Sequence, residues 1–332
     1  MTATAEAEDV LKRHLVWDAH SCLPLHPDMD VGVLERHRAQ GVDFVSVNVG
    51  MDMNPLEQVM AVLAGFRAQV RRHADRFVLA GSVADVERAR AGGRLAVAFD
   101  LEGGVPLLGR TEMVALFYDL GVRQIHLAYN RNNPLGGGCY DDDVPLTPLG
   151  RRMVAAINAA GMLMDCSHTG HRTSLDVMAA STAPVFFSHA NPRALCDDGR
   201  NVTDAQIDAC VATGGVVCVN GVGRFLGDLK AGTPAIVRHV DHLVQRVGPE
   251  RVGLGIDYCY PAGGLDENPK GLVKGYWWPK AHGYANGLDV KLAEPEQLPG
   301  IVAGLLKLGY AEGDLARILG GNMRDLAAKV WR

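Results

Sequence analysis

The sequence predicts a (β/α)₈ barrel, and three observations support this prediction. Short apolar runs rich in Val, Ile and Leu recur along the chain and alternate with amphipathic helical segments. The runs are apolar throughout, which is typical of parallel strands that are covered on both faces. The chain has 332 residues, and a complete barrel needs about 250 residues. We therefore expect one barrel domain over residues 1–332.

Eight runs are expected to form the strands of the barrel. They are HLVWDAH (14–20), GVDFVSVNVG (41–50), RLAVAFDLEGG (94–104), VRQIHLAYN (122–130), GMLMDCSH (161–168), APVFFSHA (183–190), GGVVCVNG (214–221) and RVGLGIDY (251–258). A weaker ninth run, RFVLAGS (76–82), fits an accessory strand. Eight strand–helix repeats favour a closed barrel over an open doubly wound sheet. An open sheet usually carries a glycine-rich phosphate loop after its first strand, and none follows residues 14–20.

The helices between the runs have recognisable boundaries. Residues 55–73 place apolar side chains at helical spacing. The segment 147–161 opens with Thr147 as a candidate N-cap and ends at Gly161. Residues 203–215 likewise open with a threonine as a candidate N-cap and end in glycine.

Two long segments, 131–146 and 259–293, have poor periodicity, and each follows a predicted strand. Such segments lie at the carboxyl face of a barrel. Loops at that face build active sites. We therefore expect both segments to border the functional site.

Composition excludes several classes of protein. The net charge is −5 and the pI is about 6.2, and no basic block is present to meet nucleic-acid phosphates or an anionic membrane. The seven cysteines are spread without paired spacing, which fits a reducing compartment. We find neither a signal pattern at the N-terminus nor an apolar run long enough to span a membrane. These features predict a cytoplasmic protein.

Side chains that can bind a metal stand at the carboxyl ends of otherwise apolar runs. They are His20, Glu102, His168, His189 and Asp257. The carboxyl ends of barrel strands converge on one mouth. Two imidazoles and a carboxylate that meet there make a zinc site with an open position for water. Zinc makes hydroxide available at neutral pH, and Asp257 could take the proton of that water.

Any one of these histidines, taken singly, is more often a hydrogen-bonded structural residue than a ligand. Their common position at strand ends, together with two carboxylates, favours the metal site. The remaining histidines have no such register. His126 lies inside a predicted strand, and we expect a structural role for it.

At these residues the sequence resembles the renal, or membrane, dipeptidase family of zinc peptidases. The resemblance runs along nearly the whole chain. The matching segments are DAHSCLP (18–24), DLEGG (100–104), LAYNRNNP (127–134), DCSHTG (165–170), FSHANPRALCDDGRNVTD (187–204) and GLGIDY (253–258). The family fold is the same eight-stranded barrel. The resemblance also implies a homodimer.

The resemblance implies a role for each metal-binding residue. Glu102 would bridge two zinc ions, His168 and His189 would complete one site, and His20 would belong to the other.

The same resemblance implies that Asp257 shuttles the proton from the attacking water to the leaving amine. Arg200 would hold the terminal carboxylate of the substrate, which suits the planar fork of its guanidinium. The alternative for Arg200 is a salt bridge to Asp197, Asp198 or Asp204.

Two residues depart from the family pattern. Cys22 stands where the family has the aspartate that binds the metal of His20. A thiolate can bind zinc, but a buried thiol can also be inert, so both one and two zinc ions remain open. Tyr129 stands where the family has a histidine that polarises the substrate carbonyl, and a phenol can donate a hydrogen bond in its place.

Tyr276, Trp277, Trp278 and Tyr284 lie close together in the second long segment. They could form an aromatic cage for a cationic amine substrate. The alternative is packing of a long loop or a subunit contact.

The sequence therefore predicts a zinc-dependent hydrolase of small amides, most plausibly a dipeptidase that acts on dipeptides with a free carboxylate. The expected partner is this small substrate, with neither nucleic acid nor membrane. A one-metal amidohydrolase of another small carboxylated amide is the alternative enzyme. A catalytically weak metal-containing binding protein is the alternative from another class.

Overall fold

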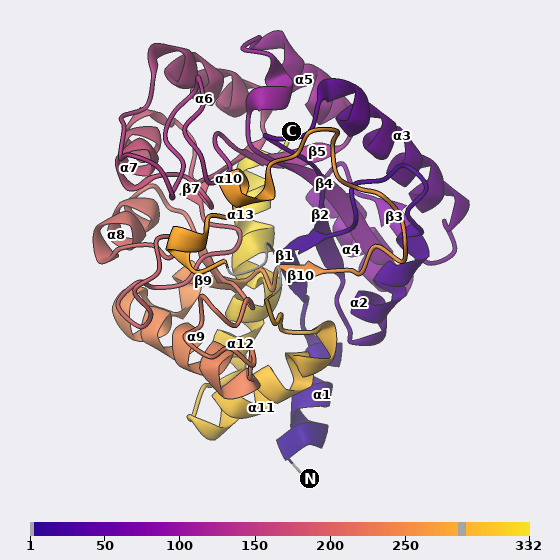
Figure 1. Cartoon of the computed structure of the whole chain (residues 1–332). Helices are drawn as coiled ribbons and strands as arrows, with labels where there is room; N and C mark the ends of the chain where they lie inside the picture. Colours follow the sequence, from indigo (N-terminus) through magenta and orange to yellow (C-terminus); the bar gives the residue numbers. More distant parts are fainter. Residues whose placement is uncertain (1–2, 285–289) are drawn as a thin grey trace.

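The chain forms the predicted barrel of parallel strands surrounded by helices (Figure 1). The structure, a computed structural model, describes residues 3–284 and 290–332. The strands of the barrel are β1 (Trp17–Cys22), β2 (Phe44–Met51), β4 (Leu95–Glu102), β5 (Val122–His126), β6 (Leu163–Asp165), β7 (Val185–Phe186), β8 (Val217–Val219) and β9 (Val252–Leu254). They pair in the order β7-β6-β5-β4-β2-β1-β9-β8. A parallel bridge between Phe187 and Val217 joins β7 to β8 and closes the ring.

Two further strands lie at the margins of the barrel. β3 (Phe77–Leu79) pairs with the first residues of β4, which confirms the accessory strand expected within residues 76–82. β10 (Tyr258–Cys259) pairs in parallel with Ser21 and Cys22 at the end of β1. β10 therefore holds the segment after β9 against the carboxyl end of β1.

Helices cover the outside of the strands (Figure 1). Their bounds are α1 (Ala3–Arg13), α2 (Glu35–Ala39), α3 (Leu56–Arg72), α4 (Val83–Ala91), α5 (Glu112–Asp119), α6 (Pro148–Ala160), α7 (His171–Ala180), α8 (Asp204–Ala212), α9 (Thr233–Val247), α10 (Lys274–Trp277), α11 (Leu298–Lys307), α12 (Glu312–Ala316) and α13 (Asn322–Val330). Val47 of β2 and Phe99 of β4 point outward and share one apolar core with Val59 and Phe66 of α3.

The helix boundaries follow from the predicted capping residues. The Thr147 side chain accepts a hydrogen bond from the Gly150 N–H and caps α6, and Gly161 ends this helix with a φ of 76°. A residue with a side chain would be strained at that left-handed angle. α8 begins at a capping box formed by Thr203 and Gln206.

A β-bulge in β1 aims side chains at the interior of the barrel. Asp18 pairs with Val45 and Ser21 pairs with Val47, so three steps along β1 oppose two steps along β2. The extra residue shifts the alternation of the strand. His20 therefore faces the interior beside Glu102, although Ala19 belongs to an interior apolar cluster.

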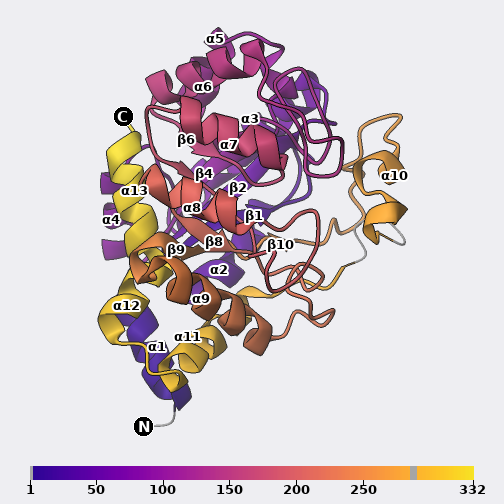
Figure 2. The same ribbon diagram turned by 90° about the vertical axis from the view of Figure 1, so that its left-hand side faces the viewer.

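The amino end of the barrel interior is filled by apolar side chains. Trp17, Phe44, Leu163 and Phe186 form one buried cluster there with Met323 of α13. In Figure 2, α13 lies at one side of the molecule and α10 projects at the opposite side. Polar side chains are therefore left to the carboxyl end, toward α10.

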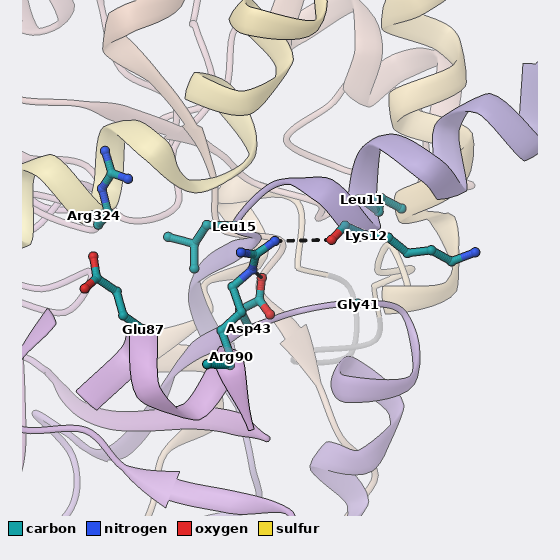
Figure 3. A pocket seen from close by; sticks show the side chains of 9 residues that line it. Leu11, Lys12, Leu15, Gly41, Asp43, Glu87, Arg90 and Arg324 are labelled. Carbon is teal, nitrogen blue, oxygen red and sulfur yellow. Dashed lines mark hydrogen bonds and ion pairs between the residues drawn. The ribbon is translucent and has the colours of Figure 1, made fainter. Parts of the chain in front are cut away.

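A cavity of about 580 Å³ lies at the amino end, between α1, α4 and α13 (Figure 3). Its lining includes Asp43, which precedes β2, and Arg90, which lies five residues before β4 begins at residue 95. The Arg90 guanidinium donates to Asp43 at 3.2 Å and to the carbonyl of Arg13 at 2.9 Å. Because Arg90 is already paired and the cavity faces away from the strand ends, this hollow is not part of the candidate site.

The structure corrects the ends of several elements. β5 ends at His126 instead of residue 130, so Tyr129 lies in a loop and His126 is the last residue of its strand. β6 and β7 have three and two residues, so His168 and His189 lie beyond the ends of their strands. The segment 259–293 contains the short helix α10, and residues 285–289 lie outside the described part. Among the described helices, none is long and apolar enough to cross a membrane.

Candidate metal centre

Four predicted ligands meet at the carboxyl mouth of the barrel. Glu102 ends β4, His20 lies on β1, and His168 and His189 follow β6 and β7. His20 Nε2 lies 3.1 Å from Glu102 Oε1, and His168 Nε2 lies 3.2 Å from Glu102 Oε2. His168 Nε2 and His189 Nε2 are 3.0 Å apart. Each oxygen of the Glu102 carboxylate therefore faces a different imidazole.

Hydrogen bonds at Nδ1 of each ring, to Asn130 and Ser188, set the tautomers of His168 and His189. Asn130 donates its amide N–H to the Trp277 carbonyl, so its Oδ1 is free to accept the Nδ1–H of His168 at 2.7 Å. The Ser188 hydroxyl donates to the acceptor-only carboxylate of Asp165. Ser188 Oγ must then accept the Nδ1–H of His189, which lies 2.6 Å away.

Both Nε2 atoms consequently present lone pairs to each other and to Glu102. Burial, together with the charge of Arg200, holds the pKa of His168 and of His189 well below the usual range, so neither imidazole is protonated. Unprotonated acceptors 3.0 Å apart repel unless a cation lies between them. The donor set therefore fits a metal ion.

The charges around Glu102 also favour a cation. Burial would raise the pKa of Glu102, but His20 and His168 outweigh burial and hold the pKa well below its usual range. Burial lowers the pKa of His20, but Asp100 and Glu102 raise it well above its ordinary value. His20 Nδ1 faces Asp100 Oδ1 at 3.3 Å. The same carboxylates that hold a proton on His20 would stabilise a metal ion in its place.

Cys22 and Asp257 stand on the His20 side of Glu102. Cys22 Sγ lies 3.4 Å from His20 Nε2 and 3.6 Å from Glu102 Oε1. Asp257 Oδ1 lies 3.6 Å from His20 Nε2, and its other oxygen accepts a hydrogen bond from Asn220 at 2.8 Å. Ligand atoms of His20, Cys22 and Asp257 all lie within 4.8 Å of one another. The Cys22 position thus has the donors of a second metal site.

Arg200 is buried beside the centre and forms no ion pair with any carboxylate of residues 3–284 or 290–332. Its side chain is 3% exposed, its Nη2 donates to the His189 carbonyl at 2.7 Å, and its Nε has no hydrogen-bond partner in the described chain. The expected alternative of a salt bridge is wrong. The three acidic side chains pair with other arginines instead: Asp197 with Arg193, Asp198 with Arg224 and Asp204 with Arg246.

Tyr129 lies over His168, with ring centroids 4.3 Å apart. Its hydroxyl oxygen accepts a hydrogen bond from the indole N–H of Trp278 at 3.1 Å. Burial raises the pKa of Tyr129 well above its usual value, so the phenol keeps its proton. Because Trp278 can only donate, the Tyr129 O–H is left to donate elsewhere. Trp278 packs on this tyrosine, which supports the packing interpretation of the aromatic loop.

Two cavities reach the centre. One, of about 130 Å³, has an apolar wall and is open to Cys22, Glu102, Tyr129, His168 and Asp257. The wall includes Leu23, Leu25, Met51, Val222, Phe225 and Leu292. The other, of about 380 Å³, is bordered by His168 and Arg200. His168 is common to both linings, so the centre is approached from two sides.

Sequence reasoning missed the residues that position the ligands. Asn48 donates to Glu102, Asn220 to Asp257, and Asn130 and Ser188 accept from the two imidazoles. One backbone signal accompanies them. Asn130, His168 and Asp257 have φ values of 59°, 60° and 56°, a conformation that residues with side chains seldom adopt. His126 is buried beside His168 and His189, with neither ring nitrogen hydrogen-bonded to the described chain.

Ser188→Ala is expected to weaken metal binding by about 10- to 100-fold, because His189 would lose the group that fixes its tautomer. Competition with a chelator measures the metal affinity. Ser181→Ala is the matched control, since Ser181 follows α7 on the outside of the barrel and bonds Asn158. Equal affinities for the two variants would contradict the role of Ser188.

The chain is similar to known proteins over most of its length. The family model of the membrane dipeptidases, peptidase family M19, matches residues 4–275. An uncharacterised protein in the pqqA 5′ region of Klebsiella pneumoniae is 34% identical over 291 residues, covering 84% of this chain and 98% of the relative. Dipeptidase tcpJ of Claviceps purpurea is 29% identical over 264 residues, covering 78% of this chain and 56% of the relative. The chain thus spans nearly all of the first relative but about half of the second.

Solved structures share the whole fold. An amidohydrolase from Pseudomonas aeruginosa superposes with a TM-score of 0.86 at 23% identity, covering 98% of this chain and 99% of that one. A metallopeptidase from Rhodobacter sphaeroides, solved with a phosphinate mimic of the dipeptide L-Ala-D-Ala, gives a TM-score of 0.77 at 21% identity, covering 96% and 99%. These similarities confirm the barrel.

Proposed function

The chain belongs to the membrane dipeptidase family of metal-dependent peptide-bond hydrolases, and from this premise we propose that it is a zinc dipeptidase for dipeptides with a free carboxylate. One observation carries the proposal. Glu102 directs its two oxygens at two different imidazoles, while His168 and His189 present lone pairs 3.0 Å apart. Only a cation makes this arrangement favourable.

We assign the ligands by their place around Glu102. His168 and His189 would hold one zinc ion with Glu102, and His20 and Cys22 would hold a second with the other oxygen of Glu102. The thiolate of Cys22 would replace a carboxylate ligand, and nitrogen, oxygen and sulfur donors all suit zinc. When bound, zinc lowers the pKa of a water molecule and polarises the substrate carbonyl.

Asp257 would carry the proton. Burial raises the pKa of its carboxyl to about 6, which suits a group that takes and returns a proton near neutral pH. Asn220 holds Oδ2, so Oδ1 is the atom directed at the centre, 3.6 Å from His20 Nε2. Oδ1 would accept the proton of the attacking water and pass it to the leaving nitrogen.

Tyr129 would stabilise the oxyanion that develops on the carbonyl. Its hydroxyl keeps its proton, and Trp278 already occupies an acceptor position of the oxygen. Tyr129 lines the cavity that is also open to Glu102 and Asp257, where this O–H would meet the substrate carbonyl. A preorganised donor of this kind acts strongly where water is excluded.

Arg200 would bind the substrate carboxylate, because a buried guanidinium that pairs with no carboxylate in the described part of the chain favours an anion. Arg200→Met is expected to lower kcat/KM for dipeptides by about 10- to 150-fold, the range for losing hydrogen bonds to a charged group. Hydrolysis of dipeptide amides, which lack the carboxylate, should change little. Steady-state kinetics on both substrate series tests the proposal.

Arg193→Met is the matched control, since Arg193 lies on the same loop and pairs with exposed Asp197. Equal losses on dipeptides and dipeptide amides would refute the assignment of Arg200. An absence of turnover by the zinc-loaded wild-type protein across both series would refute the dipeptidase proposal itself.

A further inference from the structure

Cys22 and Cys259 face each other at the mouth of the barrel. They are directly opposed in the parallel pairing of β1 with β10. Both residues also line the apolar cavity that reaches the candidate metal centre. The backbone register and the shared cavity lining therefore place both thiols at the same edge of the barrel mouth.

The spacing of paired strands suits a covalent bond between these residues. Neighbouring strands lie about 4.7–4.9 Å apart, and disulfides span Cα–Cα distances of about 4.4–6.8 Å. Opposed residues of a parallel pair also direct their side chains to the same face of the sheet. Both Cys22 and Cys259 line the apolar cavity that reaches the candidate metal centre. A bond could form there without moving either strand.

Within the described chain, the cysteines elsewhere lack such an arrangement. Cys166, Cys210 and Cys218 are buried among barrel strands and helices, and Cys210 directs its sulfur at the Val185 carbonyl. Cys196 directs its sulfur at the Arg224 carbonyl, and Cys139 directs its sulfur at Asn130 Oδ1. Cys259 is partly exposed and borders the cavity, so a small oxidant can reach it.

We propose that Cys22 and Cys259 form a reversible disulfide when hydrogen peroxide enters the cavity. The Cys259 sulfur attacks the peroxide O–O bond, which gives a sulfenic acid and one molecule of water. The Cys22 sulfur then attacks the sulfenic sulfur, forms the S–S bond and releases a second water. Two thiols lose two electrons and two protons, and one hydrogen peroxide is reduced to two waters.

The disulfide would remove a ligand from the centre. Cys22 Sγ lies 3.4 Å from His20 Nε2 and 3.9 Å from Asp257 Oδ1, and a sulfur bonded to Cys259 has no thiolate charge to offer a metal. This consequence rests on the proposed function, because it requires Cys22 to bind the second metal. Oxidation would then reduce the metal content from two ions to one, whereas formation of the disulfide does not depend on dipeptidase activity.

The test uses metal-free full-length protein and hydrogen peroxide. Thiol counting after denaturation should show the loss of two of the seven thiols, and a reductant should restore both. Mass spectrometry of a digest should identify one cross-linked species that contains Cys22 and Cys259. Cys259→Ser should give no such species, whereas Cys196→Ser should form the same disulfide as the wild type.

Loading with zinc before oxidation should slow the reaction, because a coordinated sulfur is withheld from Cys259. Peroxide treatment that leaves both thiols free, or that pairs either with another cysteine, would overturn the inference. If the disulfide forms but Cys22→Ser binds as much zinc as the wild type, the disulfide stands and the assignment of Cys22 as a ligand fails.

Discussion

Glu102→Gln is expected to abolish metal binding and to lower kcat/KM by about a thousandfold or more. Glutamine keeps the shape of the side chain but removes the charge that faces His20 and His168. Metal ions contribute several kcal/mol to charge stabilisation in such reactions, and each 1.4 kcal/mol is a factor of ten in rate. Metal analysis of the purified variant and steady-state kinetics measure the two effects.

Glu87→Gln is the matched control for Glu102→Gln, because Glu87 lies exposed on α4 beside the cavity at the amino end. It should keep the metal content and rate of the wild type. Thermal melting separates loss of the metal from loss of the fold. A folded Glu102→Gln variant with full metal content and full activity would contradict the central place of this carboxylate.

Asp257→Asn is expected to lower kcat by about 10²- to 10⁴-fold while the metal content stays near that of the wild type. Removing a general acid–base group has an effect of this size. The amide can still bond Asn220 and fill the same space, so the left-handed turn at this position is retained. Kinetics with metal analysis of the same sample provides the measurement.

The two readouts distinguish the possible roles of Asp257. Loss of rate with metal retained assigns it to proton transfer. Loss of both rate and metal would instead make Asp257 a necessary metal ligand and would contradict its role in proton transfer. The 3.6 Å distance between Asp257 Oδ1 and His20 Nε2 is compatible with such a ligand. Asp266→Asn is the control, because Asp266 is exposed in the loop that follows.

The barrel was predictable because parallel strands covered on both faces have a distinctive composition. The same pattern predicted that Glu102, His168, His189 and Asp257 lie at one mouth, since topology places the carboxyl ends of the strands there. Only Glu102 ends its strand, whereas the other three follow β6, β7 and β9 by three residues. Arg200 and the roles around it came instead from resemblance to a family, and the family match over residues 4–275 confirms that resemblance.

The local backbone geometry of the site could not be predicted from the sequence. The bulge that turns His20 inward depends on the register of β1 against β2, which a single strand does not encode. Strand β5 stops at His126 because the chain then turns, with Asn130 at a φ of 59°. The apolar pattern alone had predicted a strand that continues to residue 130.

Hydrogen-bond partners that are distant in the sequence could not be predicted either. Trp278 bonds Tyr129 across 149 positions, and Asn130 bonds His168 across 38. Such pairs depend on the conformation of the loops at the barrel mouth. The sequence contains no motif in which the spacing of Trp278 or Asn130 from its partner indicates a hydrogen bond. The opposition of Cys22 and Cys259 is of the same kind, because it depends on the pairing of β10 with β1.

The most direct test of the metal centre is anomalous X-ray diffraction at the zinc edge from crystals of the zinc-loaded protein. We expect one peak beside His168 and His189 and a second beside His20 and Cys22, with Glu102 between them. If no peak lies within ligand distance of His168, His189 and Glu102 in zinc-loaded crystals, the convergence of the strand ends does not serve metal binding, and the proposed hydrolysis is contradicted.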